Sequence, residues 1–139
     1  MAQNKDKRAN KALQKKKHSK EVSPEIPEKL QALLSKALRN HQFGLFDHAI
    51  ISYRQILDLM PSYADANHLL GVALHQNGEL QESASQIRKA IKYDSRKPTI
   101  HIILGNVLKD MECFNEAIDC FREALMLDPQ NLNAHINIG

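Results

Sequence analysis

The chain has 139 residues, of which 42% are hydrophobic and 25% charged, and its formal net charge is +3. The length fits a single domain, and the composition is that of an ordinary globular protein rather than a fibrous or wholly disordered chain. No stretch is apolar over the length that a membrane-spanning helix needs, so we expect no membrane span.

Residues 1–20 form a basic opening with eight Lys or Arg side chains against one Asp. This segment lacks Val, Ile, Phe, Tyr and Trp, so it buries too little apolar surface to offset the entropy of ordering, and we predict a disordered tail. It also lacks the apolar core of a secretory signal, which favours a cytoplasmic location. The run Lys15 to Lys20 leaves three alternatives open: a nuclear localisation signal, a patch for nucleic acid or anionic lipid, or a solvated lead-in. The lead-in is favoured, so nucleic acid is not the expected partner.

Residues 21–29 carry two prolines and change the sign of the charge, which predicts a short linker into the first helix. Ser23 or Pro27 marks the predicted start of that helix.

Residues 30–139 repeat one pattern with a period of 34 residues. Residues 64–97 and 98–131 are two copies, residues 30–63 are a more diverged copy, and residues 132–139 are the first eight positions of a fourth. Apolar residues recur within each copy at steps of three and four, which predicts two amphipathic helices per copy. A fixed period of this length indicates stacked helical hairpins.

Glycine recurs at two places in the repeat. Gly71 and Gly105 stand at position 8, counted from Ala64, where a small residue lets the two helices of a hairpin approach closely. Gly44 and Gly78 stand at position 15 and suit the left-handed backbone that ends the first helix. Glu112 replaces this glycine in the next copy, so we expect its turn to be built differently.

Prolines mark the ends of the second helix. Met60-Pro61 and Asp128-Pro129 are predicted to end it, because the residue before proline is pushed out of the helical region. Pro98 is predicted to sit at the start of a helix, where its missing N–H costs nothing.

Large and small apolar residues share fixed positions in the repeats from Ala64. They are Leu70 and Leu104 at position 7, Leu80 and Phe114 at 17, Ile87 and Phe121 at 24, and Ala90 and Ala124 at 27. This pattern resembles tetratricopeptide repeats, which implies an all-α, right-handed superhelical solenoid of antiparallel helix hairpins. The segments Ala64 to Val72 and Ala134 to Gly139 look like those of bacterial multi-repeat proteins, whose arrays often precede a transferase domain. We therefore expect the sequence to be the N-terminal part of a longer protein.

Catalytic motifs are missing from the sequence: there is no glycine-rich phosphate loop and no nucleophile elbow. Neither HExxH nor a closed set of zinc ligands occurs, and His101 and His135 at position 4 are better explained as packed aromatic substitutes. Cys113 and Cys120 form no CxxC pair and are expected to be reduced thiols. We predict no enzyme, metal or cofactor.

Function is then expected on the concave face, which in the family is lined by the first helix of each repeat. The resemblance implies an extended peptide or partner protein as ligand. The groove residues carried over are Leu34, Leu38, His41, Asp65, His68, Val72, His75, Gln76, Ile102, Asn106 and Lys109.

Two known uses of such a groove can be compared with this chain. The carboxylate clamp of chaperone-binding members is absent, since its positions hold Leu34, Leu38, Leu69, Thr99 and Ile103. The asparagine ladder of O-GlcNAc transferase-like arrays is matched by Asn137 alone. The alternative function is the substrate-recognition arm of such a transferase, with catalysis beyond Gly139. Self-association through the uncapped C-terminal repeat is a further expectation.

Overall fold

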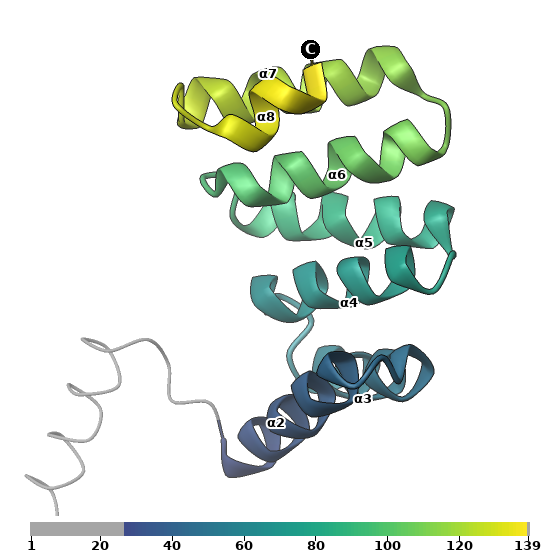
Figure 1. The fold of residues 1–139 in the computed structure, drawn as a ribbon. Coiled ribbons are helices and arrows are strands. Elements are labelled where there is room, and N and C mark those ends of the chain that lie inside the picture. Colours follow the sequence, from purple (N-terminus) through teal and green to yellow (C-terminus); the bar gives the residue numbers. More distant parts are fainter. Residues whose placement is uncertain (1–26, 139) are drawn as a thin grey trace, which may run out of the picture. The chain divides into compact units, whose positions relative to one another are not determined.

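The computed structural model describes residues 27–138, and within them it contains helices and no strand, which confirms the predicted all-α class. The chain divides into two units, residues 1–31 and 32–139. The predicted tail and residues 21–26 of the predicted linker lie outside the described residues. The helices are α2 (Glu28–Gln42), α3 (Phe46–Leu59), α4 (Ala64–Gln76), α5 (Leu80–Tyr93), α6 (Pro98–Asp110), α7 (Phe114–Leu127) and α8 (Leu132–Ile138) (Figure 1).

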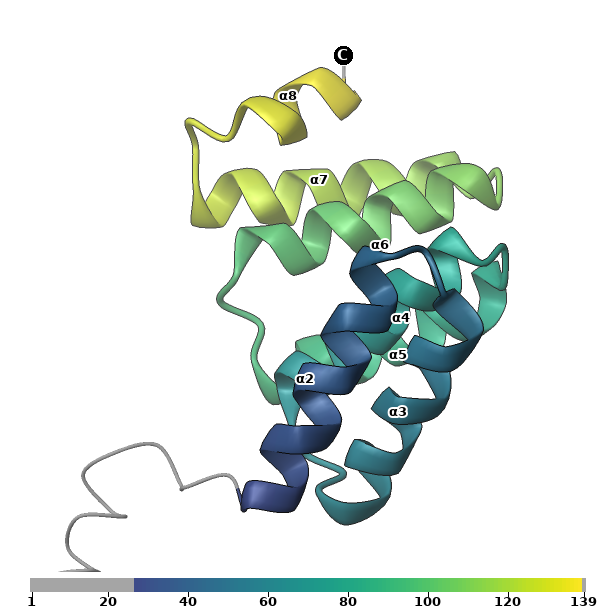
Figure 2. The same cartoon turned by 60° about the horizontal axis from the view of Figure 1, so that its bottom comes forward.

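The helices of the second unit pack as successive hairpins. Helices α4 and α5 form one hairpin and α6 and α7 the next, and both pairs pack closely along their lengths. The hairpins stack because α3 contacts α4, α5 contacts α6, and α7 contacts α8 (Figures 1 and 2). The first helices of neighbouring repeats also touch, α4 with α6 and α6 with α8. We call the first helix of each repeat its A helix and the second its B helix.

Close contact within the α4–α5 and α6–α7 hairpins depends on the glycine at position 8. A Cβ atom built on Gly71 would lie 2.3 Å from Cγ1 of Ile87, and one on Gly105 would lie 2.5 Å from Cε1 of Phe121. The Oγ of Ser83 uses the same proximity to donate a hydrogen bond to the carbonyl of Gly71, at 2.6 Å. The predicted close approach is confirmed.

The turns between A and B helices all use a left-handed residue. Gly44 and Gly78 have φ of 75° and 84°, as predicted. Glu112 has φ of 63°, so the prediction of a different turn was wrong. The reason is the hydrogen bond that closes the turn. The N–H of Glu79 donates to the carbonyl of Leu74 at 2.8 Å, and the N–H of Cys113, which follows Glu112, donates to the carbonyl of Leu108 at the same distance. This bond needs left-handed backbone whatever the side chain is.

Helix ends follow the predicted proline signals. Helix α3 ends at Leu59 before Met60-Pro61, and α7 ends at Leu127 before Asp128-Pro129. Pro98 is the first residue of α6. At the other end of the array, α2 begins at Glu28 directly after Pro27, two residues before the array was predicted to start. None of the helices within residues 27–138 has the length and hydrophobicity to cross a membrane.

Candidate functional site

The residues predicted to bind a ligand all lie on three A helices, which we call the A-helix surface. Helix α2 carries Leu34, Leu38 and His41, α4 carries Asp65, His68, Val72, His75 and Gln76, and α6 carries Ile102, Asn106 and Lys109. Since α4 contacts α6 directly, side chains of neighbouring repeats come within hydrogen-bonding reach. Five of these residues, His41, Asp65, His75, Gln76 and Lys109, form polar contacts with residues outside their own helix.

Two histidines link successive A helices through the same register. The Nε2 of His41 lies 2.5 Å from Oε1 of Gln76, joining α2 to α4. The Nε2 of His75 lies 2.6 Å from Oδ2 of Asp110, joining α4 to α6. Both contacts run from position 12 of one copy to position 13 of the next, 35 residues apart. We call this pair of contacts the A-helix ladder.

The His41–Gln76 contact of the A-helix ladder is connected to the core. The hydroxyl of Tyr53, whose side chain is fully buried, lies 3.0 Å from Nδ1 of His41. Burial raises the pKa of Tyr53 to about 12, so the phenol keeps its proton. Because Oε1 of Gln76 only accepts, Nε2 of His41 donates to it, while Nδ1 on the other side of the same ring contacts the Tyr53 hydroxyl. The core therefore fixes the orientation of a surface imidazole.

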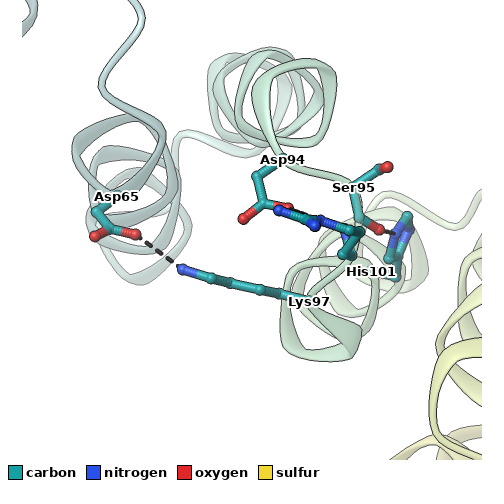
Figure 3. A network of polar contacts seen from close by, with 6 residues as sticks. Asp65, Asp94, Ser95, Lys97 and His101 are labelled. Atoms are coloured by element: carbon teal, nitrogen blue, oxygen red, sulfur yellow. Dashed lines mark hydrogen bonds and ion pairs between the residues drawn. The ribbon is translucent and has the colours of Figure 1, made fainter. Parts of the chain in front are cut away.

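Two further predicted residues are held by neighbouring repeats. Lys97, just before α6, points toward Asp65 on α4 (Figure 3), and its Nζ lies 3.1 Å from Oδ1 of that residue. The Nζ of Lys109 on α6 donates to Oδ1 of Asn137 on α8 at 3.3 Å. These contacts, like the A-helix ladder, tie each A helix to the next.

Position 9 of the three copies offers a different surface. It holds Leu38, which is 38% exposed, and Val72 and Asn106, which are half-buried. Ile102, at position 5, is only 6% exposed, so it does not present an apolar contact at the surface. We call Leu38, Val72 and Asn106 the position-9 stripe.

His68 differs from the other histidines of the A-helix surface. Its Nε2 is buried and has no hydrogen-bond partner among residues 27–138. Burial is the main reason that its pKa is lowered, while Asp65 raises the pKa and Lys97 lowers it further. The ring is therefore neutral at physiological pH.

The side chain at position 4 forms a hydrogen bond with the backbone of the preceding turn. The side chain of His101 points toward the backbone of Ser95 (Figure 3), and its Nε2 lies 2.9 Å from the Ser95 carbonyl oxygen. The amide of Asn67 donates to the carbonyl of Pro61 at 3.1 Å. His101 is buried as predicted, but His135 is exposed although it makes the equivalent contact to Pro129. Within residues 27–138, α8 is followed by no B helix that would cover it.

No group of three or more His, Cys, Asp or Glu side chains within residues 27–138 is placed to hold a metal ion. Cys113 and Cys120 are both free thiols. Burial raises the pKa of the Cys120 thiol, which disfavours the reactive thiolate.

A pocket lies away from the A-helix surface, between α3, α4 and α5. It has a volume of about 420 Å³ and shares no residue with the predicted set. Asn67, which contributes to its wall, stands where the next copy has the larger His101. Its lining residues are Arg54, Leu57, Asp58, Pro61, Asn67, Leu70, Gln86, Lys89 and Tyr93.

The B helices have a ladder of their own, which sequence analysis missed. Arg54 pairs with Glu82 at 2.5 Å, and Arg88 pairs with Glu116 at 3.4 Å. Each contact runs from position 25 of one copy to position 19 of the next, 28 residues apart. The recurrence of Arg and Glu at these two positions was the available signal. We call these ion pairs the B-helix ladder.

Recurring hairpins, recurring glycines and two recurring ladders define a helical repeat protein. Family models described as "Tetratricopeptide repeat" match residues 64–97 and 98–131. The chain is therefore a tetratricopeptide-repeat protein. Such repeats form non-catalytic scaffolds for protein–protein interaction.

The curated relatives are much longer than this chain and match it over a small part of their length. The chain is 27% identical over 111 residues to N-alpha-acetyltransferase 16, NatA auxiliary subunit, of Mus musculus, covering 78% of this chain and 13% of the relative. It is 29% identical over 111 residues to the cell division cycle protein 16 homolog of Homo sapiens, covering 70% and 18%. The chain thus spans less than a fifth of the length of these relatives.

Solved structures share the fold. The first repeat domain of Spaghetti (RPAP3), bound to the HSP90 peptide SRMEEVD, superposes with a TM-score of 0.77 at 18% identity, covering 81% of this chain and 90% of that one. The O-GlcNAc transferase of Thermobaculum terrenum gives a TM-score of 0.72 at 28% identity, covering 78% and 21%.

Proposed function

We propose that the A-helix surface binds an extended peptide segment of a partner protein, with the position-9 stripe as its centre. The observation that carries this proposal is that some positions of the A helices contact neighbouring repeats while another position is left partly exposed. Positions 12 and 13 are occupied by contacts between repeats, whereas Leu38, Val72 and Asn106 are partly exposed on three successive helices. Two apolar side chains followed by an amide suit a peptide that has both apolar and polar groups.

The spacing of the stripe favours an extended ligand. Packed helices lie roughly 8–10 Å apart, and an extended chain in the polyproline II conformation advances about 3.1 Å per residue and returns to the same side about every three residues. A peptide crossing the A helices would therefore meet Leu38, Val72 and Asn106 with side chains about three residues apart. The expected ligand has two apolar residues at that spacing and a polar residue about three further on, which the amide of Asn106 can recognise.

A similar fold holding a peptide supports this proposal, because the RPAP3 domain is bound to SRMEEVD. The ligand of the present chain should be different in chemistry. The positions of a carboxylate clamp hold Leu34, Leu38, Leu69, Thr99 and Ile103, none of which carries a positive charge. We therefore expect an apolar internal segment rather than an acidic C-terminus.

The proposal is tested by selecting peptides from a displayed random library on the 139-residue protein and measuring the Kd of the best binder. Val72→Glu should weaken binding at least about tenfold, since it places a charge against an apolar contact. Asn106→Ala should weaken it by a smaller factor. Met126→Glu is the matched control, because Met126 is 76% exposed on a B helix and its variant should bind normally. Equal binding by Val72→Glu would place the site elsewhere.

A second candidate function is the substrate-recognition arm of an O-GlcNAc transferase-like or other transferase, favoured by the 28% identity to the Thermobaculum terrenum enzyme. It predicts that the protein isolated from its source cells transfers the group to peptides that residues 1–139 bind without modifying. Absence of transfer by the isolated protein would leave the scaffold role. Both candidates include a cytoplasmic location, which fractionation of source cells checks.

A further inference from the structure

The pocket between α3, α4 and α5, which we call the α3–α5 pocket, owes part of its volume to a short side chain at position 4. In the next copy the imidazole of His101 stands at this position, is 8% exposed and lies 2.9 Å from the carbonyl of Ser95. Asn67 makes the equivalent contact to Pro61 with a smaller side chain. The resulting volume of about 420 Å³ falls within the range of small-molecule sites, which is roughly 300–1,000 Å³.

The lining of the α3–α5 pocket carries two opposite charges that are not paired with each other. The carboxylate of Asp58 comes from α3, and the ammonium group of Lys89 comes from α5. Within residues 27–138 neither side chain forms an ion pair, whereas Arg54, also in the lining, is paired with Glu82 at 2.5 Å. The pocket therefore offers one unneutralised anion and one unneutralised cation to a ligand.

The amide side chains of the lining add hydrogen-bonding groups beside these charges. The amide nitrogen of Asn67 on α4 donates to the carbonyls of Pro61 and Tyr63, so its oxygen is the atom that can accept a hydrogen bond from a ligand. Gln86 lies about one turn before Lys89 on α5 and can donate from its amide. The anion and the Asn67 acceptor thus lie on the α3–α4 side of the pocket, and the cation lies on the α5 side.

The rest of the lining is largely apolar. Leu70 is 1% exposed and Leu57 is half-buried, and Pro61 lies beside them. Tyr93 is 48% exposed and adds an aromatic ring from α5. An apolar side chain of a ligand would lose its contact with water against these residues, which favours its binding.

We propose that the α3–α5 pocket binds an α-amino acid that has an apolar side chain. The ammonium group of the ligand would pair with Asp58 and donate to the oxygen of Asn67. Its carboxylate would pair with Lys89, and its side chain would lie against Leu57 and Leu70. A ligand with a single charge would leave the opposite charge of the pocket unpaired, so the pocket selects a zwitterion over a simple anion or cation.

The probe is L-phenylalanine, and its binding is followed by heteronuclear NMR titration of the 139-residue protein. We expect saturable shifts at the backbone amides of Asn67, Gln86 and Lys89, which belong to the lining. N-acetyl-L-phenylalanine lacks the cation, and L-phenylalaninamide lacks the carboxylate. Each should bind about twofold to fivefold more weakly than L-phenylalanine, which is the effect of losing one exposed ion pair.

Substitutions of the two charged residues test which ligand group each one recognises. Asp58→Asn should reduce the preference for L-phenylalanine over its N-acetyl form, because the ammonium group then has no anionic partner. Lys89→Gln should reduce the preference over the amide form for the corresponding reason. Lys92→Gln is the matched control, since Lys92 is exposed about one turn after Lys89 on α5 and does not belong to the lining.

Asn67→His places in the pocket the side chain that the next copy carries at position 4, and it should abolish binding of L-phenylalanine. Circular dichroism confirms that each variant keeps the fold. Absence of saturable shifts at the lining amides, equal affinities of the three probes for wild type, or undiminished binding to Asn67→His would overturn the proposal. Asp58 and Lys89 are both exposed, so their variants decide the question if Asn67→His does not fold.

The α3–α5 pocket shares no residue with the position-9 stripe. Peptide binding at the stripe is therefore scored separately, and its failure leaves this result intact.

Discussion

The imidazole of His75 lies 2.6 Å from the carboxylate of Asp110, although 35 residues separate them along the chain. The pair joins α4 to α6, and its side chains are 25% and 50% exposed. We expect His75→Ala and Asp110→Ala each to lower the free energy of unfolding by about 0.5–1 kcal/mol, with a coupling of similar size in a double-mutant cycle. Urea unfolding of the wild type, both single variants and the double variant measures these free energies. A cycle pairing Asp110→Ala with Lys92→Ala should be additive, and additivity in the His75 cycle too would contradict a stabilising ladder.

Glu112 is a non-glycine residue with φ of 63°. Left-handed backbone costs an L-residue roughly 1–2 kcal/mol, so Glu112→Gly should raise the free energy of unfolding by about 1 kcal/mol after the entropy that glycine loses. Glu112→Ala removes the charge but keeps the backbone strain, and it should leave stability nearly unchanged. Thermal unfolding of the three proteins decides, and equal stabilisation by both variants would assign the effect to charge.

Gly105 lies where α6 and α7 approach too closely to leave room for a Cβ atom. A Cβ atom at this position would lie 2.5 Å from the ring of Phe121, which is buried and has little room to move. Gly105→Ala should therefore lower the free energy of unfolding by about 1–3 kcal/mol despite the better helix propensity of alanine. Thr99→Ala, at an exposed site of the same helix, is the control. A stability gain in Gly105→Ala would show that the helices can separate at no cost.

His68 should make stability depend on pH. Because burial lowers its pKa in the folded state, the unfolded chain takes up a proton first as the pH falls through about 6.5, and stability is lost from there down to the folded pKa. His68→Gln removes this linkage, so its stability relative to wild type should improve between pH 7.5 and pH 5.5. Val72→Ala, a non-titrating change on the same helix, should keep the wild-type pH dependence. A constant difference between His68→Gln and wild type would contradict the buried neutral ring.

The hairpins could be predicted because the signals for them are local. A stripe of apolar residues at steps of three and four describes one helix, and the glycine opposite Ile87 or Phe121 describes one hairpin. Each such signal concerns residues that are close in sequence. The turn at Glu112 was predicted wrongly because a non-glycine residue disfavours left-handed backbone, whereas the hydrogen bond that closes the turn requires it.

Contacts between repeats could not be predicted in the same way. Their partners depend on the offset at which one hairpin stacks on the next, and no single copy contains that offset. His41 and Gln76 were both expected to face a ligand, yet they face each other, and Ile102 was expected at the surface but is buried. The binding role of the A-helix surface itself stays a prediction.

The constant spacing of both ladders makes residues 64–97 removable without a change of register. If residues 64–97 were excised, Arg54 would meet Glu116 at the register where it now meets Glu82, and His41 would meet Asp110 in place of Gln76. Duplication of residues 64–97 would likewise place a Glu at position 19 opposite Arg88 and a Gln at position 13 opposite His75. We therefore expect a protein in which residues 64–97 are removed or duplicated to keep both ladders.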